Sequence, residues 1–294
     1  MERAAARTDW LGLGAVALAV AIWAGWIVLV RGSVGAALNP FDIAALRYGA
    51  PAALLAPVLW RSGLLPRGVA PWRMAAMTLG WGAPFAVFAA EGLRDGTTAL
   101  FAALVPGSLP LWVAAISAVT IGVRLSRRAR LGLALIALGA ALALIRAAWA
   151  GEGAALAGAP WLIGASIAWA TYTLAYRGSG LTPLEATAAV AFWSCVMLAP
   201  AVPLGWLSLG ALTPAALATQ LVLHGVVSGV ISVFAFAVAI RRLGAQRAAA
   251  FSALVPVLAS LGGVAVLGEP AAPDVALAVG AASLGVWLVN TARP

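Results

Sequence analysis

Four polar side chains lie four residues apart in a stretch of the sequence that is otherwise apolar. They are Gln220, His224, Ser228 and Ser232, and in an α-helix this spacing places them on one face within about 120°. His224 is the only histidine of the chain, and an imidazole can bind a solute or exchange a proton near neutral pH. The stripe predicts either the polar wall of a solute cavity or a set of hydrogen bonds across a helix interface.

A second group of candidates is cationic or aromatic. Arg47 lies inside an apolar run, where its guanidinium would suit an anionic solute. Its stem could instead extend to the membrane surface, or its guanidinium could cap the exposed carbonyls of a neighbouring helix end. Aromatic side chains recur at helical spacing in three apolar runs, and the cavity candidates among them are Trp23, Trp81, Trp169 and Tyr172. Stripes of this kind also form packing or interfacial belts, so both interpretations stay open.

The composition excludes most catalytic and cofactor chemistry. The chain has one histidine, one cysteine and no lysine, so it offers neither three or four converging metal ligands nor the lysine of a phosphate-binding loop. Its acidic residues fall at the ends of apolar runs or between them, which leaves no intramembrane carboxylate pair for acid–base catalysis. We therefore expect no enzyme, no metal and no cofactor. Three alternative functions nevertheless stay open to a chain of this composition, namely those of a membrane-embedded enzyme, a channel and a structural membrane subunit.

The elements that position these candidates must be helices that span a membrane. Of the 294 residues, 64% are hydrophobic and 9% are charged, with a mean hydropathy of +1.02, whereas soluble domains carry about 25% charged residues. A run of about 20 apolar residues can cross the hydrocarbon core. Ten such runs are predicted, at residues 10–30, 42–60, 73–92, 97–121, 129–147, 157–176, 184–205, 215–240, 246–267 and 274–291. The sequence predicts an all-α protein whose surroundings are the lipid bilayer.

Arginine placement predicts the orientation. If the N-terminus is cytoplasmic, fourteen of the 18 arginines fall on cytoplasmic segments and three, Arg31, Arg94 and Arg146, fall on outer loops. Cytoplasmic loops of membrane proteins carry an excess of basic residues. We therefore expect a protein of the bacterial inner membrane with both termini in the cytoplasm. The net charge of +9 follows from this topology and does not indicate nucleic-acid binding.

The two halves of the chain resemble each other. Residues 23–33 (WAGWIVLVRGS) align without gaps with residues 169–179 (WATYTLAYRGS) at an offset of 146. The same offset pairs a proline and two glycines of each half, namely Pro110 with Pro256, Gly122 with Gly268 and Gly139 with Gly285. The motif ALVP, at residues 103–106 and 253–256, offers a rival register, and the third and eighth spans align poorly.

Each repeat holds five predicted spans, which is an odd number. The second repeat must therefore be inverted relative to the first, an arrangement of secondary transporters whose solute site lies between the repeats near mid-membrane. We predict a first five-helix repeat at residues 1–147, a linker with the start of the second repeat at 148–160, and the second five-helix repeat at 161–294.

These features resemble the EamA-type members of the drug/metabolite transporter superfamily. The resemblance rests on the ten spans in two repeats, on NPFDIAALRYGAP (residues 39–51) opening the second span, and on ALVPVLASLGGVAVLGEP (residues 253–270) before the last one. Members typically end the fourth and ninth helices in a Gly-Glu pair. This chain keeps Gly268-Glu269 but has Gly122-Val123 in the first half, which puts in doubt a role for that acid in the first repeat.

The resemblance implies a central cavity lined by helices one to four and six to nine. It also implies dimerisation through the fifth and tenth helices and the transport, often the export, of small metabolites such as amino acids. The expected function is that of a secondary transporter or exporter of small amphipathic metabolites that works by alternating access.

Overall fold

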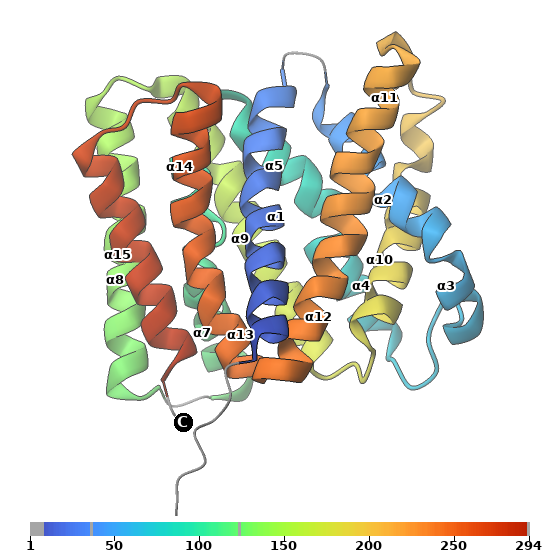
Figure 1. Ribbon diagram of the computed structural model, residues 1–294, viewed down its shortest axis with the longest axis horizontal. Helices are drawn as coiled ribbons and strands as arrows, with labels where there is room; N and C mark the ends of the chain where they lie inside the picture. The colour runs from blue at the N-terminus through green and yellow to red at the C-terminus, as the bar shows by residue number, and fades with distance from the viewer. Residues whose placement is uncertain (1–8, 36–37, 123–124, 293–294) are drawn as a thin grey trace, which may run out of the picture.

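The chain folds into a bundle of helices that lie side by side (Figure 1). This computed structural model describes residues 9–35, 38–122 and 125–292, and no β-strand forms among them. The helices of the first half are α1 (Trp10–Ser33), α2 (Pro40–Leu54), α3 (Ala56–Ser62), α4 (Pro71–Trp81), α5 (Ala83–Asp95), α6 (Thr98–Leu104), α7 (Leu109–Ile121) and α8 (Arg127–Trp149). Those of the second half are α9 (Gly153–Arg177), α10 (Pro183–Leu198), α11 (Pro214–Gln220), α12 (Ser232–Leu243), α13 (Ala245–Phe251), α14 (Val255–Leu267) and α15 (Pro273–Asn290). Short 3-10 helices are η1 (Ala199–Ala201), η2 (Leu209–Ala211) and η4 (Ser252–Leu254), and η3 (Leu221–Ile231) is a π-helix.

The two ends of the bundle differ in what they hold. Helix α1 begins and α15 ends at the end drawn lowest in Figure 1, which we call the terminal end. Helix α11 begins at the opposite end, which we call the distal end. Helix α1 begins at the terminal end and therefore ends at the distal end, where it connects to α2. The distal end also holds the loops between α5 and α6, α8 and α9, and α14 and α15.

Eight helical segments among the described residues are long and apolar enough to cross a membrane, and a ninth is counted if the bent pair α2–α3 forms one span. The axes of α2 and α3 differ by 66°, and Pro51 lies inside α2 just before the bend, where proline removes a backbone donor. The third predicted span corresponds to α4 and α5, which Gly82 separates and which do not pass as one span. The all-helical membrane fold is confirmed, and the count of ten spans stays a prediction.

The packing of α8 against α15 is that expected of an inverted repeat. Helices α8 and α15 begin 146 residues apart and therefore occupy equivalent places in the two halves. A Cβ at Gly139 would lie 2.6 Å from the carbonyl oxygen of Ala278, and one at Gly285 would lie 2.5 Å from that of Gly132. Rising residue numbers in α8 thus meet falling numbers in α15, so these equivalent helices run antiparallel. The same glycines let the two backbones approach closely.

The helices before α8 and α15 repeat in the same register. Helices α7 and α14 have 13 residues each, begin 146 residues apart, and end at Gly122 (φ 64°) and Gly268 (φ 68°) in the left-handed conformation that glycine adopts easily. Pro110 and Pro256 each lie in the first turn of these helices, where proline is well tolerated. This agreement favours the offset of 146 over the rival register suggested by the two ALVP motifs.

The third and eighth spans differ in structure, which explains their poor alignment. Helix α4 ends at Gly82, and the hydroxyl of Ser194 accepts a hydrogen bond from the backbone N–H of Ala83 at 3.0 Å where α5 begins. Equivalent helix starts lie 143 residues apart for α2 and α10 and for α4 and α11, but 146 apart for α7 and α14. The eighth span with its flanking turns therefore holds three more residues than the third. A π-helix accommodates extra residues because its hydrogen bonds span i to i+5.

Candidate functional site

A cavity of about 710 Å³ lies between the two halves of the bundle. Its walls include segments of the predicted spans one to four and six to nine, as the resemblance implies. Helix α15, which belongs to the tenth span, also contributes to them. Leu125, Arg177 and Asn290 line it at the terminal end. Among the described residues, none from the loops of the distal end lines it. The cavity therefore opens toward the terminal end, and its volume is typical of sites for small organic molecules.

Seven of the nine side chains predicted for a solute site line this cavity. They are Trp23, Arg47, Trp81, Trp169, Tyr172, Ser228 and Ser232. Gln220 and His224 are not among the lining residues. These seven were singled out in the sequence because their residue types are costly or unusual in hydrocarbon, and their contact with a solute stays a prediction.

Arg47 is buried on the cavity wall, with 5% of its surface exposed. Its Nη1 donates a hydrogen bond to the hydroxyl of Ser228 at 2.7 Å. Its Cζ lies 4.1 Å from the ring centroid of Trp26 and 5.5 Å from that of Trp81, within the range of cation–π attraction. No carboxylate pairs with it in the part of the chain that the structure describes. Of the roles open to Arg47, the geometry favours a guanidinium that faces the cavity over one that reaches the membrane surface.

Aromatic rings cover one side of the cavity around Trp81. Its ring centroid lies 4.6 Å from that of Trp169 and 5.8 Å from that of Tyr172, and the hydroxyl of Tyr48 donates to the carbonyl oxygen of Trp81 at 2.6 Å. Tyr172 stacks in turn on Tyr176 at 5.6 Å. These contacts fix the rings in place and leave an apolar surface with few polar atoms.

A second pair of aromatic rings on the cavity wall occupies the equivalent place in the repeat. Trp23 occupies the place in α1 that Trp169 occupies in α9, and its ring lies 4.8 Å from that of Phe236 in α12. Trp169 of the second half thus packs on Trp81 in the third span, which breaks at Gly82. Trp23 of the first half packs on Phe236 in the eighth span, which contains the π-helix. Phe236 was missed in the sequence because the eighth span does not align with the third.

The π-helix η3 separates the four polar side chains of the predicted stripe. Ser228 and Ser232 reach the cavity, whereas His224 is fully buried and neither ring nitrogen has a hydrogen-bond partner among the described residues. The buried Oε1 of Gln220 also lacks a partner there. A π-helix has more residues per turn than an α-helix, so residues four apart drift around its axis and leave the common face.

Replacing His224 with leucine is expected to preserve solute uptake and to keep or raise thermal stability. A buried polar group without a hydrogen-bond partner costs about 1–3 kcal/mol, and leucine of similar volume removes that penalty. Thermal unfolding in detergent and uptake into liposomes measure the two effects. Ser228→Ala is the matched control on the cavity wall and is expected to weaken uptake. Lost uptake in His224→Leu at unchanged stability would show instead that the imidazole acts on the solute.

Two close approaches join η3 to α2 beside Arg47. A Cβ at Gly225 would lie 2.6 Å from the Cβ of Ala50 and 2.7 Å from the carbonyl oxygen of Leu46. One at Gly229 would lie 2.6 Å from Cγ of Pro51. Only glycine allows this spacing, which brings the Ser228 hydroxyl within reach of the guanidinium.

Glu269 connects the two halves at the distal end. Its Oε1 accepts a hydrogen bond from the backbone N–H of Thr98 at 3.0 Å, and its Oε2 accepts one from the hydroxyl of Thr98 at 2.5 Å. The Nε of Arg31 lies 3.8 Å from Oε1. The acid of the Gly-Glu pair thus holds the start of α6 and is not among the residues that line the cavity. Val123, at the equivalent place in the first half, lies outside the described residues.

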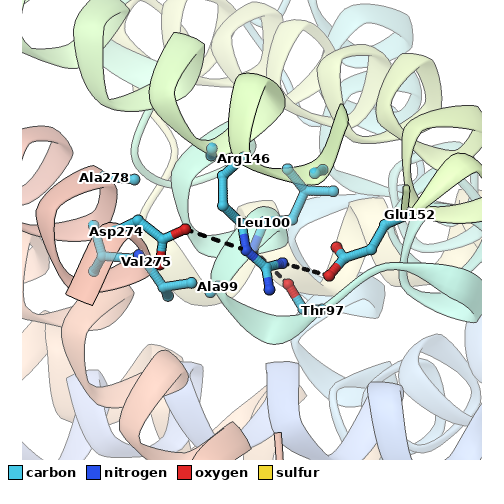
Figure 2. Close-up of a pocket in the computed structure, with 11 residues that line it drawn as sticks. Thr97, Ala99, Leu100, Arg146, Glu152, Asp274, Val275 and Ala278 are labelled. Atoms are coloured by element: carbon cyan, nitrogen blue, oxygen red, sulfur yellow. Dashed lines mark hydrogen bonds and ion pairs between the residues drawn. The ribbon is translucent and has the colours of Figure 1, made fainter. Parts of the chain in front are cut away.

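Arg146 makes a second connection at the distal end (Figure 2). Its Nη1 lies 2.6 Å from Oε1 of Glu152, and its Nε lies 3.7 Å from Oδ2 of Asp274. One guanidinium therefore joins the last turn of α8 to the start of α9 and the start of α15. The pocket beside it has a volume of about 20 Å³, which is room for about one water molecule and none for a metabolite.

A third connection lies at the start of α2. The side-chain amide of Asn39 donates to the carbonyl oxygen of Trp206 at 2.9 Å, and a carboxylate oxygen of Asp42 accepts from the backbone N–H of Ser208 at 2.8 Å. Asp42 also accepts from the backbone N–H of Asn39, which completes a capping box. We call the contacts made by Asn39, Asp42, Glu269 and Arg146 the distal ties, because each joins the first half of the chain to the second.

Comparison with known proteins agrees with this architecture. The model of the EamA-like transporter family matches residues 10–145 and matches again at residues 156–291. The chain belongs to the EamA-like transporter family. The two matched segments of this EamA-like transporter begin 146 residues apart, which is the offset of its helices α7 and α14. Membership makes the chain a membrane transporter and not an enzyme.

Solved structures share the fold of this EamA-like transporter. Eleven chains match, and one of them, described as "Crystal structure of protein", superposes with a TM-score of 0.61 over 94% of this chain and 95% of its own at 22% sequence identity. At that identity the likeness concerns the fold alone. No match was found among curated proteins.

Proposed function

We propose that this EamA-like protein is a secondary transporter or exporter of small amphipathic metabolites, amino acids and related compounds among them, which works by alternating access in the bacterial inner membrane. The observation that carries the proposal is the cavity of about 710 Å³ between two inverted repeats, lined as far as the terminal end and not at the distal end. Solute sites of such transporters lie between the repeats and are reached from one side at a time.

The solute is proposed to contact the seven predicted side chains on the cavity wall. Arg47, Ser228 and Ser232 supply polar contacts, and Trp23, Trp81, Trp169 and Tyr172 supply apolar ones. Gln220 at the end of α11 and His224 in η3 lie behind this wall. The mixture of a few polar groups with a large aromatic surface suits an amphipathic metabolite.

Closure of the distal end is proposed to depend on the distal ties. All of them join the first repeat to the second, so the repeats must separate there before the cavity can open to that side. Ionic and hydrogen-bonded contacts suit such a seal because water replaces them when the end opens, which makes their net contribution small and their exchange reversible.

The terminal end is proposed to face the cytoplasm. At the distal end, Arg31, Arg94 and Arg146 each lie 2.6–3.8 Å from a carboxylate oxygen. At the terminal end, Arg242 alone among the described arginines does so, with Asp9 at 3.8 Å. Unneutralised positive charge thus gathers at the terminal end, in keeping with the excess of basic residues on cytoplasmic loops. Four further arginines predicted there lie outside the described residues, namely Arg3, Arg7, Arg124 and Arg293.

Ten spans and a homodimer complete the proposal. Counting the broken pair α4–α5 as one span, and the bent pair α2–α3 as another, gives five spans in each repeat. Helices α8 and α15 are the fifth and tenth, and they expose Leu131, Leu138, Leu277 and Leu284 away from the cavity. This apolar surface suits lipid or a second copy of the chain.

Transport by the purified protein in liposomes tests the proposal. Uptake of labelled amino acids and of their deaminated, amidated and decarboxylated relatives is measured with and without a pH gradient. We expect saturable uptake of at least one class above that of protein-free liposomes. Turnover of a lipid without solute flux would contradict the proposal and favour a membrane-embedded enzyme, and unsaturable flux would favour a channel.

A further inference from the structure

The charges that line the cavity are of one sign. Its charged lining residues are Arg47 and Arg177, and no aspartate or glutamate is among the lining residues that the structure describes. Arg177, at the end of α9, is exposed at the mouth, whereas Arg47 is buried deep in the wall. A solute that enters therefore meets positive charge at the opening and again inside.

The guanidinium of Arg47 is incompletely satisfied by the protein. It carries five N–H donors, and among the described residues its side chain hydrogen-bonds to Ser228 and to Tyr48. The rings of Trp26 and Trp81 compensate part of its charge. A buried cation without an acidic partner is costly, so an anion placed against the remaining donors would gain the strength of a charge-assisted, bidentate contact.

We propose that the cavity selects solutes that carry a net negative charge on an aromatic or apolar body, with the carboxylate bound by Arg47 and Ser228 and the body against Trp81, Trp169 and Tyr172. This inference rests on the proposed transport function and narrows its solutes from amphipathic metabolites in general to those with a net negative charge, which excludes zwitterionic amino acids. The hydroxyl of Ser228 lies 2.7 Å from Nη1 of Arg47, so both groups can bind one carboxylate.

The same geometry disfavours zwitterions. In an α-amino acid the ammonium and the carboxylate share one carbon, so a carboxylate on Arg47 would bring the ammonium within a few ångströms of the guanidinium. No lining carboxylate is there to receive it, and like charges at such distances repel strongly away from water. The aromatic faces nearest to this place, those of Trp26 and Trp81, already lie beside a cation.

Four ligands that share a phenyl ring and a short chain test the inference. They are 3-phenylpropanoate, L-phenylalanine, 3-phenylpropanamide and 2-phenylethylamine, which are anionic, zwitterionic, neutral and cationic. Binding to the purified full-length protein is measured by calorimetry and by quenching of tryptophan fluorescence, with empty micelles as the blank. We expect the anion to bind about tenfold more tightly than the other three. Equal or tighter binding of phenylalanine would overturn the proposal.

Arginine variants locate the effect. Arg47→Met is expected to abolish the preference for the anion and to leave binding of the amide unchanged, and Arg47→Lys is expected to retain part of the preference. Arg61→Met makes the same change at an exposed arginine outside the cavity and is expected to have no effect. A preference that survives Arg47→Met would overturn the assignment, and the wild-type ligand series decides the question even if that variant does not fold.

Flux of a permanently charged analogue separates this inference from the transport proposal. The sulfonate 3-phenylpropane-1-sulfonate crosses lipid poorly without a carrier, so its uptake into liposomes reports the protein. Binding of the anions without flux of any solute would contradict the transport function and leave the selectivity standing. Flux of phenylalanine without binding or flux of the anions would contradict the selectivity and leave the transport function standing.

Discussion

A cysteine at Thr173 is expected to react with a membrane-impermeant thiol reagent from the cytoplasmic side and not from the opposite side. Thr173 lines the cavity, which reaches the terminal end, while the distal ties are proposed to close the other end. The variant is made in a Cys195→Ser background, because Cys195 is the only native cysteine. Labelling is compared between right-side-out and inside-out membrane vesicles.

A second cysteine provides the control. Gly210 lies exposed in η2 at the distal end, where a side chain would meet no atom within 4 Å, so Gly210→Cys is expected to react from the outer side alone. Arg146→Ala combined with Glu269→Ala removes two of the distal ties and is expected to expose Thr173→Cys to the outer side as well. Labelling of Thr173→Cys from the outer side in the parent protein would contradict the proposed closure.

Gly225→Ala is expected to lower the thermal stability and to weaken anion binding. The new Cβ would lie 2.6 Å from Ala50 Cβ and 2.7 Å from the carbonyl oxygen of Leu46, so η3 must move away from α2. Overpacking of this kind costs about 1–3 kcal/mol, and the shift lengthens the hydrogen bond between Arg47 and Ser228. Thermal unfolding and ligand titration measure the two effects.

Gly49→Ala is the matched control for this change. Gly49 lies in α2, where an added Cβ meets nothing within 4 Å, so alanine there is expected to keep or raise the stability through its better helix propensity. Equal stability of the two variants would show that η3 and α2 are not held at the close spacing that the glycines allow.

The sequence predicted the wall of the cavity better than it predicted the eighth span. Arg47 and the aromatic residues stand out because cations and amphipathic rings are unusual in apolar runs, whatever the local helix geometry. The stripe from Gln220 to Ser232 depended on a period of 3.6 residues, and η3 does not keep that period. A π-helix leaves no mark in hydrophobic periodicity, although the change of repeat offset from 143 to 146 is a signal that a closer alignment could have used.

Two contacts at the distal end also could not be predicted from the sequence. Glu269 was expected from the family pattern, but its contact with Thr98 joins residues 171 apart, and no local pattern indicates such a partner. The pairing of Arg146 with Asp274 is of the same kind. Charge counts predicted on which side these residues lie and could not predict which of them meet.

The unlike third and eighth spans make the two halves energetically unequal. In an inverted repeat the opposite conformation is reached when each half adopts the shape of the other. Here that exchange would require α4–α5, which breaks at Gly82, to become like η3, and the π-helix to break in its place. Three additional residues in one half prevent a perfect exchange, so under the proposed alternating access the two states are expected to differ in free energy and the empty carrier to rest in one of them. A solute must then bind the disfavoured state more tightly to populate it. The proposed transport cycle is therefore expected to run faster in one direction than in the other, while the equilibrium distribution of the solute stays unchanged.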